Sequence, residues 1–285
     1  MQRYAKPETV DDALTLLAGD SWRILAGGTD FYPAQGARPI RDNVLDINGL
    51  DELRGIREES GGVTIGGRTT WTDIVRASLP PAFDGLKLAA REVGAIQIQN
   101  TGTVAGNLCN ASPAADGVPP LLTLDAEIVL RSRRGERRIP LQNFIQGNRR
   151  TDRQPDELLV AVHIPSAAAA GRSSFLKLGA RRYLVISIAM AAVRLVTDAA
   201  GRIEDVAIAV GACSAVAQRL PALEQALFGH VLDESIAAVI EPQHLAPLQP
   251  IDDVRGSAAY RHAAAREIVA RALLAVAAPA KRVAA

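Results

Sequence analysis

Cysteine and histidine are scarce in this sequence, and neither is spaced to bind a metal. The two cysteines, Cys109 and Cys213, lie far apart and belong to no CxxC pattern, whereas an iron–sulfur cluster is held by about four thiolates. The 4 histidines contain no pair at the spacing of metal ligands. We therefore expect no metal site on this chain, and we expect Cys109 to serve as a small buried side chain.

Long apolar runs and an excess of one charge are also missing. The run at residues 184–193, apolar except for Ser187, ends at Arg194 and is about half of the ~20 residues needed to cross a bilayer. No secretory signal precedes the first helical pattern. The formal net charge of +1 does not suit a nucleic-acid binder, which needs a concentrated basic face. We expect a cytoplasmic protein with no membrane span and no nucleic-acid partner.

The length and composition indicate a folded protein with more than one module. The chain has 285 residues, of which 48% are hydrophobic and 22% charged, which is too long for one small domain. The pattern of apolar and turn residues predicts three parts, at residues 1–55, 56–171 and 172–285.

A short apolar run ends at two glycines in the segment Ile24-Leu25-Ala26-Gly27-Gly28-Thr29-Asp30. Glycine adopts φ > 0 readily, and without a Cβ it lets an anion approach the backbone N–H groups. Thr29 would add a hydroxyl donor, while Asp30 would accept a bond from a ribose or ribityl hydroxyl or cap the next turn. Alone, this segment indicates either a phosphate-binding loop or an ordinary tight turn.

A second stretch, residues 101–107 with its continuation to Asp116, has the same chemistry. Its small residues permit close approach, and its hydroxyl and amide groups can donate to oxygen. Alone, it also fits a turn rich in Asn, Ser, Pro and Gly. Two such loops in one chain favour one long ligand held at two places. A third glycine pair, Gly66-Gly67, is predicted to be a packing turn with at most a minor ligand contact.

Three ordered motifs carry a family resemblance: AGGTD at 26–30, TVAGN at 103–107 and ASPAAD at 111–116. Together they resemble the FAD-binding medium subunit of the molybdenum hydroxylases, the family of bacterial xanthine dehydrogenases and carbon monoxide dehydrogenases. The resemblance covers essentially the whole chain, including IGGRTTWTDI at 65–74 and FLKLGARR at 175–182.

The resemblance implies an α+β protein. Its first two parts would form a two-subdomain FAD-binding fold of the vanillyl-alcohol-oxidase/p-cresol methylhydroxylase type, followed by a C-terminal α+β domain with a small antiparallel sheet. The implied function is electron transfer: FAD on this chain would take electrons from [2Fe-2S] clusters of a partner and pass them to NAD⁺ or another acceptor. Such work needs position and electrostatics from the protein rather than an acid, base or nucleophile, so we name no catalytic residue.

The implied complex is an oxidoreductase of three kinds of subunit. A large partner would hold the molybdenum cofactor and the substrate, and a small partner would hold two [2Fe-2S] clusters. The substrate would therefore be recognised on another chain.

The resemblance also assigns cofactor-binding residues. Leu25 to Asp30 would line a pyrophosphate loop, Asp116 would accept a ribose or ribityl hydroxyl, Leu159 would pack against the ring system, and Lys177 would approach the flavin. The complete set is Leu25, Ala26, Gly27, Gly28, Thr29, Asp30, Thr103, Ala105, Gly106, Asn107, Asn110, Asp116, Leu159 and Lys177.

Two departures from the family pattern bear on this assignment. The second motif usually has two glycines before its asparagine, and the first of them is Ala105 here; we expect it to be tolerated with φ < 0. Animal xanthine dehydrogenases carry acidic residues after the lysine-containing strand, where this chain has Tyr183-Leu184-Val185. NAD⁺, oxygen, a quinone and a ferredoxin-like protein all stay open as acceptors.

Two other functions are the alternatives. A nicotinamide-dependent dehydrogenase of Rossmann type would need a G-x-G-x-x-G motif after a strand, and none is found. A non-catalytic assembly or binding subunit would leave the paired loops unexplained. The arginine-rich run at residues 131–138 contains no aromatic residue for stacking on bases, so it predicts a solvated hairpin tip.

Overall fold

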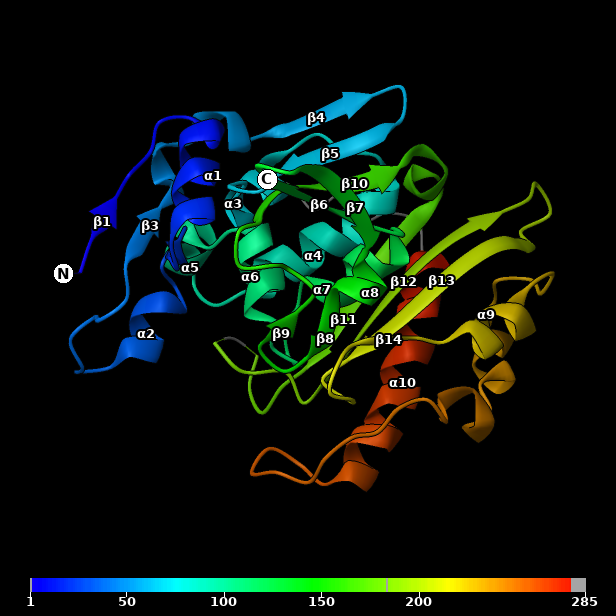
Figure 1. Ribbon diagram of the computed structural model, residues 1–285. Helices are drawn as coiled ribbons and strands as arrows, with labels where there is room; N and C mark the ends of the chain where they lie inside the picture. Colours follow the sequence, from blue (N-terminus) through cyan, green and yellow to red (C-terminus); the bar gives the residue numbers. More distant parts are fainter. Residues whose placement is uncertain (1, 183, 278–285) are drawn as a thin grey trace.

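The computed structural model describes residues 2–182 and 184–277. Its N-terminal module is a parallel three-stranded sheet in the order β1-β3-β2, with one helix after β1 and another after β2 (Figure 1). The first helix begins after Thr9, whose hydroxyl accepts a hydrogen bond from the Asp12 N–H at 3.2 Å. The elements are β1 (Tyr4–Ala5), α1 (Val10–Gly19), β2 (Arg23–Leu25), α2 (Phe31–Gln35), β3 (Val44–Asp46), η1 (Ile47–Gly49) and η2 (Asp51–Leu53).

The middle module is an antiparallel five-stranded sheet in the order β4-β5-β10-β6-β7. A group of helices is inserted in the chain between β5 and β6. Its strands and helices are β4 (Ile56–Glu59), β5 (Gly62–Gly66), α3 (Trp71–Arg76), η3 (Pro81–Phe83), α4 (Asp84–Glu92), α5 (Ile96–Thr101), α6 (Val104–Asn110), α7 (Val118–Thr123), β6 (Glu127–Ser132), β7 (Gly135–Pro140), α8 (Leu141–Phe144), β8 (Ile145–Gly147), β9 (Arg150–Thr151), β10 (Leu158–Pro165) and η4 (Ser166–Ala169).

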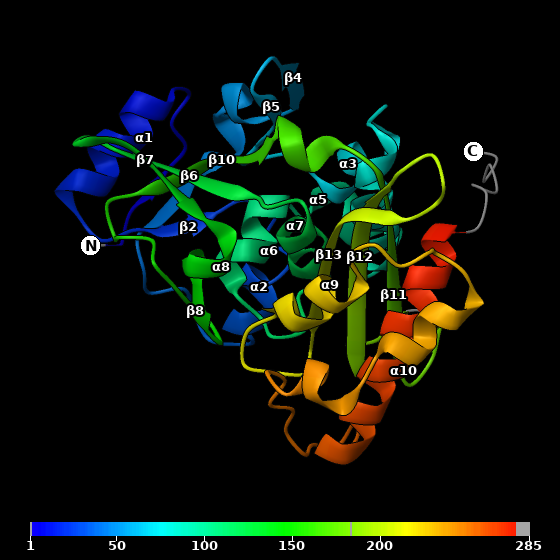
Figure 2. The ribbon, with the colours of Figure 1, turned by 90° about the vertical axis from the view of Figure 1, so that its right-hand side faces the viewer.

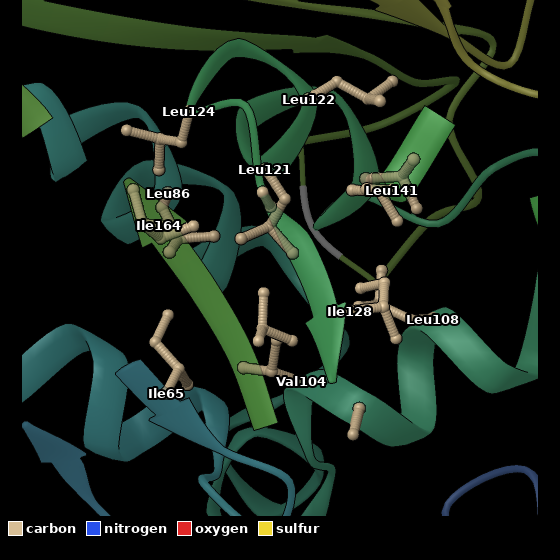
Figure 3. Packing of buried hydrophobic residues seen from close by; sticks show 14 of the residues in the cluster. Ile65, Leu86, Val104, Leu108, Leu121, Leu122, Leu124, Ile128, Leu141 and Ile164 are labelled. Atoms are coloured by element: carbon tan, nitrogen blue, oxygen red, sulfur yellow. The ribbon is translucent and has the colours of Figure 1, made fainter. Parts of the chain in front are cut away.

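Apolar side chains join this sheet to its helices. The close view shows Ile65 of β5, Ile128 of β6 and Ile164 of β10 in one cluster with Val104 and Leu108 of α6 (Figure 3). Each of these five side chains is fully buried. The core therefore fixes α6, which carries the second predicted motif, against the sheet.

The arginine-rich run forms the β6–β7 hairpin, as predicted, and acidic residues balance its charge. Arg137 pairs with Glu157 at 2.6 Å and with Asp152 at 2.7 Å, and Arg134 pairs with Asp156 at 2.5 Å. The two carboxylates raise the pKa of Arg137 above its ordinary value. Ion pairs with acidic residues therefore balance the charges of Arg134 and Arg137 in this run.

The C-terminal part is an antiparallel four-stranded sheet in the order β11-β12-β13-β14. Along β12 the side chains alternate: Ala191 and Val193 belong to the cluster beneath α10, whereas Met190 and Ala192 pack with Ala89 of α4. Figure 2 shows α9 and α10 together on one side of this sheet. The elements are β11 (Arg172–Leu178), β12 (Ala189–Thr197), β13 (Ile203–Gly211), β14 (Gln218–Arg219), α9 (Pro221–Leu227), η5 (Glu234–Val239), η6 (Pro242–Leu245) and α10 (Ala258–Ala277).

The mixed α+β composition predicted from the sequence is confirmed. Within residues 2–182 and 184–277, no helix is long and apolar enough to span a bilayer.

Candidate functional site

A cavity of about 780 Å³ lies between the N-terminal and middle modules, and its volume is within the ~300–1,000 Å³ range of small-molecule sites. One side is formed by β2 and the loop after it; the other is formed by α6, the β8–β9 region and the start of β10. Most residues predicted from the sequence lie on its wall: Ala26, Gly27, Gly28, Thr29, Asp30, Thr103, Ala105, Gly106, Asn107, Asn110 and Leu159.

Gly27 brings the first loop against the second segment. A Cβ built on Gly27 would lie 1.9 Å from the carbonyl oxygen of Thr101, so a larger residue would push the two walls apart. Gly28 has a φ of 74°, the left-handed conformation that favours glycine. The sequence predicted glycines for the approach of an anion. The structure adds that Gly27 is required by the approach of the protein's own backbone.

The first loop offers unpaired donors to the cavity. Among the described residues, no acceptor is found for the N–H groups of Gly27, Gly28, Thr29 and Asp30. Asp30 precedes α2, but its carboxylate makes no capping bond with that helix, so the capping alternative for Asp30 is wrong. These residues are half-buried or exposed and line the cavity, so their free N–H groups can receive the oxygens of a ligand.

The second predicted loop is a helix in the structure. Residues 104–110 form α6, and the Thr103 hydroxyl caps it by accepting a hydrogen bond from the Gly106 N–H at 3.0 Å. Glycine and asparagine are weak helix formers, which is why the sequence indicated a loop. A bond from the Val104 N–H to the Thr69 carbonyl, at 3.0 Å, fixes the start of the helix from the neighbouring strand end.

The Gly66-Gly67 pair is a packing turn, as predicted. A Cβ on Gly66 would lie 2.3 Å from the Leu53 carbonyl oxygen, and one on Gly67 would lie 2.4 Å from that of Leu159. Gly67 also lies on the cavity wall.

Ala105 replaces a glycine of the family motif without backbone strain. It lies inside α6 and is not among the residues with positive φ, as expected. Two residues later, the Asn107 side-chain oxygen is buried and has no hydrogen-bond partner within the described part of the chain. Leaving such an oxygen unpaired costs about 1–3 kcal/mol. Because Asn107 lines the cavity, a donor on a bound ligand would satisfy it.

Leu25, Asp116 and Lys177 were predicted to bind the cofactor, but the structure does not place them on the cavity wall. Leu25 is buried against Phe31. Asp116 accepts hydrogen bonds from the Lys177 ammonium and from the Ser187 hydroxyl, each at 2.6 Å. Burial raises the pKa of the Asp116 carboxyl, while Lys177 and Ser187 act in the opposite direction. This cluster joins the middle module to β11.

Arginines line the cavity at positions that the motifs did not indicate. Arg23 lies 3.6 Å from the Asp42 carboxylate and stacks 4.1 Å from the Phe31 ring. Arg153 donates to backbone carbonyls, including that of Glu157 at 2.8 Å. The others are Arg41 and Arg149. The run Arg149-Arg150-Thr151-Asp152-Arg153 is basic in the sequence, but only the fold brings Arg149 and Arg153 to the cavity wall.

Cys109 lies on the same wall. Burial raises the pKa of its thiol to about 11, although the Arg153 charge acts in the opposite direction. At neutral pH the side chain is therefore a protonated, small group. Among the described residues, no cluster of His, Cys, Asp and Glu could hold a metal ion.

These features fit FAD. Its diphosphate needs hydrogen-bond donors and positive charge, which the first loop and the arginines supply. Its flavin ring needs apolar surface, which Leu158 and Leu159 supply.

Two protein-family models match in tandem. The "FAD binding domain in molybdopterin dehydrogenase" matches residues 1–167, and the "CO dehydrogenase flavoprotein C-terminal domain" matches residues 174–276. This chain belongs to the family of FAD-binding subunits of molybdopterin dehydrogenases. This chain is 32% identical over 276 residues to the glyceraldehyde dehydrogenase medium chain of Sulfolobus acidocaldarius, with 93% of each chain covered.

Solved structures agree with this membership. Carbon monoxide dehydrogenase from Hydrogenophaga pseudoflava has a chain that superposes with a TM-score of 0.88 at 31% identity, covering 96% of both chains. Quinoline 2-oxidoreductase from Pseudomonas putida 86 gives a TM-score of 0.87 at 28% identity, covering 97% of both. The family resemblance predicted from the sequence is confirmed, and the chain is an oxidoreductase subunit.

Proposed function

We propose that this FAD-binding subunit holds its FAD in the cavity between the first loop and α6. The supporting observation is that the residues with free N–H groups in the first loop line the same cavity as Asn107, whose side-chain oxygen is unpaired in the described chain. In this proposal Gly27 to Asp30 receive the diphosphate beside the start of α6, while Asn107 accepts a hydrogen bond from the cofactor. Leu159 packs against the ring system.

Asp116 and Lys177 stay predictions of the family resemblance. They contact each other in the structure, and β11, which carries Lys177, lies at the edge of the C-terminal sheet. We propose that this pair lies behind the part of the cavity wall that receives the flavin ring. It would also hold the C-terminal sheet against the middle module.

We propose that the chain works as an electron relay. Bound FAD accepts electrons and releases them in pairs, and the protein's part is to hold it and exclude side reactions. The expected donors are two [2Fe-2S] clusters on a small partner, next to a large partner with the molybdenum cofactor, in a heterotrimer. The solved carbon monoxide dehydrogenase from Hydrogenophaga pseudoflava lacks the Mo-pyranopterin moiety of the molybdenum cofactor, which supports a molybdenum-containing partner.

This chain does not determine the substrate, and it leaves more than one electron acceptor open. NAD⁺, oxygen, a quinone and a ferredoxin-like protein stay open as acceptors, because Leu184 and Val185 supply no acidic group after the lysine-containing strand. Tyr183 lies outside the described residues. The relatives are named for glyceraldehyde, carbon monoxide and quinoline. Such varied names suit a substrate site on another subunit.

Several finer expectations stay predictions. These are the fold type of the vanillyl-alcohol-oxidase/p-cresol methylhydroxylase kind, the domain boundaries at residues 55 and 171, and a cytoplasmic location. A nicotinamide dehydrogenase and a redox-inactive assembly subunit are the competing functions. The first would also use free N–H groups for a diphosphate, but the sequence has no G-x-G-x-x-G motif, and the second needs no such groups.

A rapid-mixing experiment on the purified complex tests the relay. When the substrate of the large subunit is added without an acceptor, the visible flavin absorption should bleach after the iron–sulfur signal changes, and added acceptor should restore it. A flavin that stays oxidised while the clusters are reduced would contradict the relay. A complex without flavin would support the assembly alternative.

A further inference from the structure

Resting on the proposed function, we infer that Arg149 is a diphosphate-binding residue for FAD. It belongs to neither glycine-containing motif. It lies between β8 and β9, on the wall of the cavity. The β8–β9 region would thus form a third contact to the cofactor, beside the first loop and α6.

The backbone holds Arg149 in a conformation that costs free energy. Its φ is 55°, in the left-handed region that favours glycine. The residue that it contacts, Ala111 at the end of α6, has a φ of 48° and is fully buried. The Arg149 N–H donates to the Ala111 carbonyl at 3.1 Å. One hydrogen bond therefore joins two residues that both have unfavourable backbone conformations. This bond fixes the β8–β9 turn to the end of α6.

The side chain is fixed toward the site by a predicted cofactor residue. The Arg149 Nη1 donates to the Asn110 Oδ1 at 2.8 Å, and Asn110 lies on the cavity wall. Asn110 is neutral, so this bond orients the guanidinium without neutralising it. The remaining N–H groups of the fork can receive phosphate oxygens.

The charge of Arg149 lacks a counterion in the described chain. No described carboxylate forms an ion pair with it within 4.0 Å. By contrast, Arg134 and Arg137 of the β6–β7 hairpin are paired with acids. The diphosphate carries the negative charge of FAD at neutral pH, so it is the group that this cation would attract.

Arg150 is a matched control. It is adjacent and exposed, it forms no ion pair with a carboxylate among the described residues, and its Nη2 donates to the Gln146 carbonyl at 2.8 Å. It does not line the cavity. The two arginines carry the same charge, but Arg149 lines the cavity and Arg150 does not.

The test titrates the full-length chain, stripped of flavin, with FAD and with riboflavin, which has no phosphate. Arg149→Gly keeps the left-handed backbone accessible, so it should fold with an unchanged or higher Tm. Its Kd for FAD should rise about tenfold or more, with unchanged riboflavin binding. Its Kd should also respond less to sodium chloride, because an ionic contact is screened by salt.

Arg150→Ala should bind FAD within about twofold of wild type. If Arg149→Gly folds poorly, Arg149→Asn serves instead, because asparagine tolerates φ > 0. An unchanged Kd and salt response in the Arg149 variant would overturn the inference, as would an equal loss of FAD and riboflavin binding. A wild-type chain that binds no FAD would refute the proposed function itself.

Discussion

Two sets of polar groups in this molecule are satisfied to different degrees. In the cluster of Asp116, Lys177 and Ser187, each of the two carboxylate oxygens has a donor at 2.6 Å. At the cavity, the Asn107 side-chain oxygen has no partner in the described chain, and consecutive N–H groups of the first loop have none.

The difference separates structure from ligand binding. A satisfied cluster such as Asp116 with Lys177 stabilises the contact between two modules without needing anything else. The unpaired Asn107 oxygen costs folding free energy, because buried polar groups without partners are unfavourable. We infer that the wall around Asn107 is completed by the cofactor, and the variants below break or sharpen this comparison.

Gly27→Val should have the largest effect. The added side chain would meet the Thr101 carbonyl at the Cβ position, 1.9 Å away, so the walls of the cavity would separate. We expect the FAD affinity to fall by about 100-fold or more, with a lower Tm. Flavin fluorescence titration and thermal unfolding measure both. Gly61→Ala is the control, because a Cβ on Gly61 meets nothing within 4 Å; wild-type affinity in Gly27→Val would show that the walls need not touch.

Asp116→Leu should damage the satisfied cluster. It leaves the Lys177 ammonium buried without a counterion, and breaking a buried pair in this way costs about 3–5 kcal/mol. The double variant Asp116→Leu/Lys177→Met removes both charges and should recover most of this loss. Urea unfolding of the flavin-free chain gives the free energies of unfolding. If the double variant is no more stable than Asp116→Leu, the pair is not the source of the loss.

Asn107→Leu should have opposite effects on stability and on binding. Replacing an unpaired buried amide with an apolar side chain of similar size should stabilise the flavin-free chain by about 1 kcal/mol. The same change should weaken FAD binding about tenfold or more, because a polar contact to the cofactor is lost. Calorimetry of the flavin-free chain and a binding titration separate the two. A destabilised chain with intact binding would mean that Asn107 is structural.

The Cys109 thiol should give the smallest effect. Its pKa is raised from 9.0 to about 11, so at pH 8 its thiolate population is about 100-fold below that of an ordinary cysteine. Alkylation by iodoacetamide, followed by mass spectrometry, should therefore be slow and should accelerate as the pH rises toward 11. Bound FAD should slow it further. Rapid alkylation at pH 8 that FAD does not change would place Cys109 away from the site.

The sequence predicted the chemistry of the site better than its shape. Gly27, Gly28 and Thr103 were predicted from two segments of like chemistry together with the family resemblance, and all three line the cavity. The helical state of residues 104–110 was missed, because the capping by Thr103 is local but the bond to Thr69 is tertiary.

The arginines could not be assigned to the site from sequence. Arg149 and Arg153 follow the first loop by more than a hundred residues, and their approach to the cavity depends on how the β8–β9 region folds back on α6. Asp116 and Lys177 show the converse case: the resemblance predicted a cofactor contact, whereas the structure brings the two side chains to each other. Pairing of this kind depends on the packing of two modules.

The central claim is that the cavity between the first loop and α6 holds FAD, and the most direct measurement is the flavin content of the purified chain. The protein is denatured, and the released cofactor is identified and quantified against the protein. We predict about one FAD per chain in the wild type and a large loss in Gly27→Val, with Gly61→Ala unchanged. A wild-type chain that is colourless and takes up no added FAD would contradict the account, as would full FAD content in Gly27→Val.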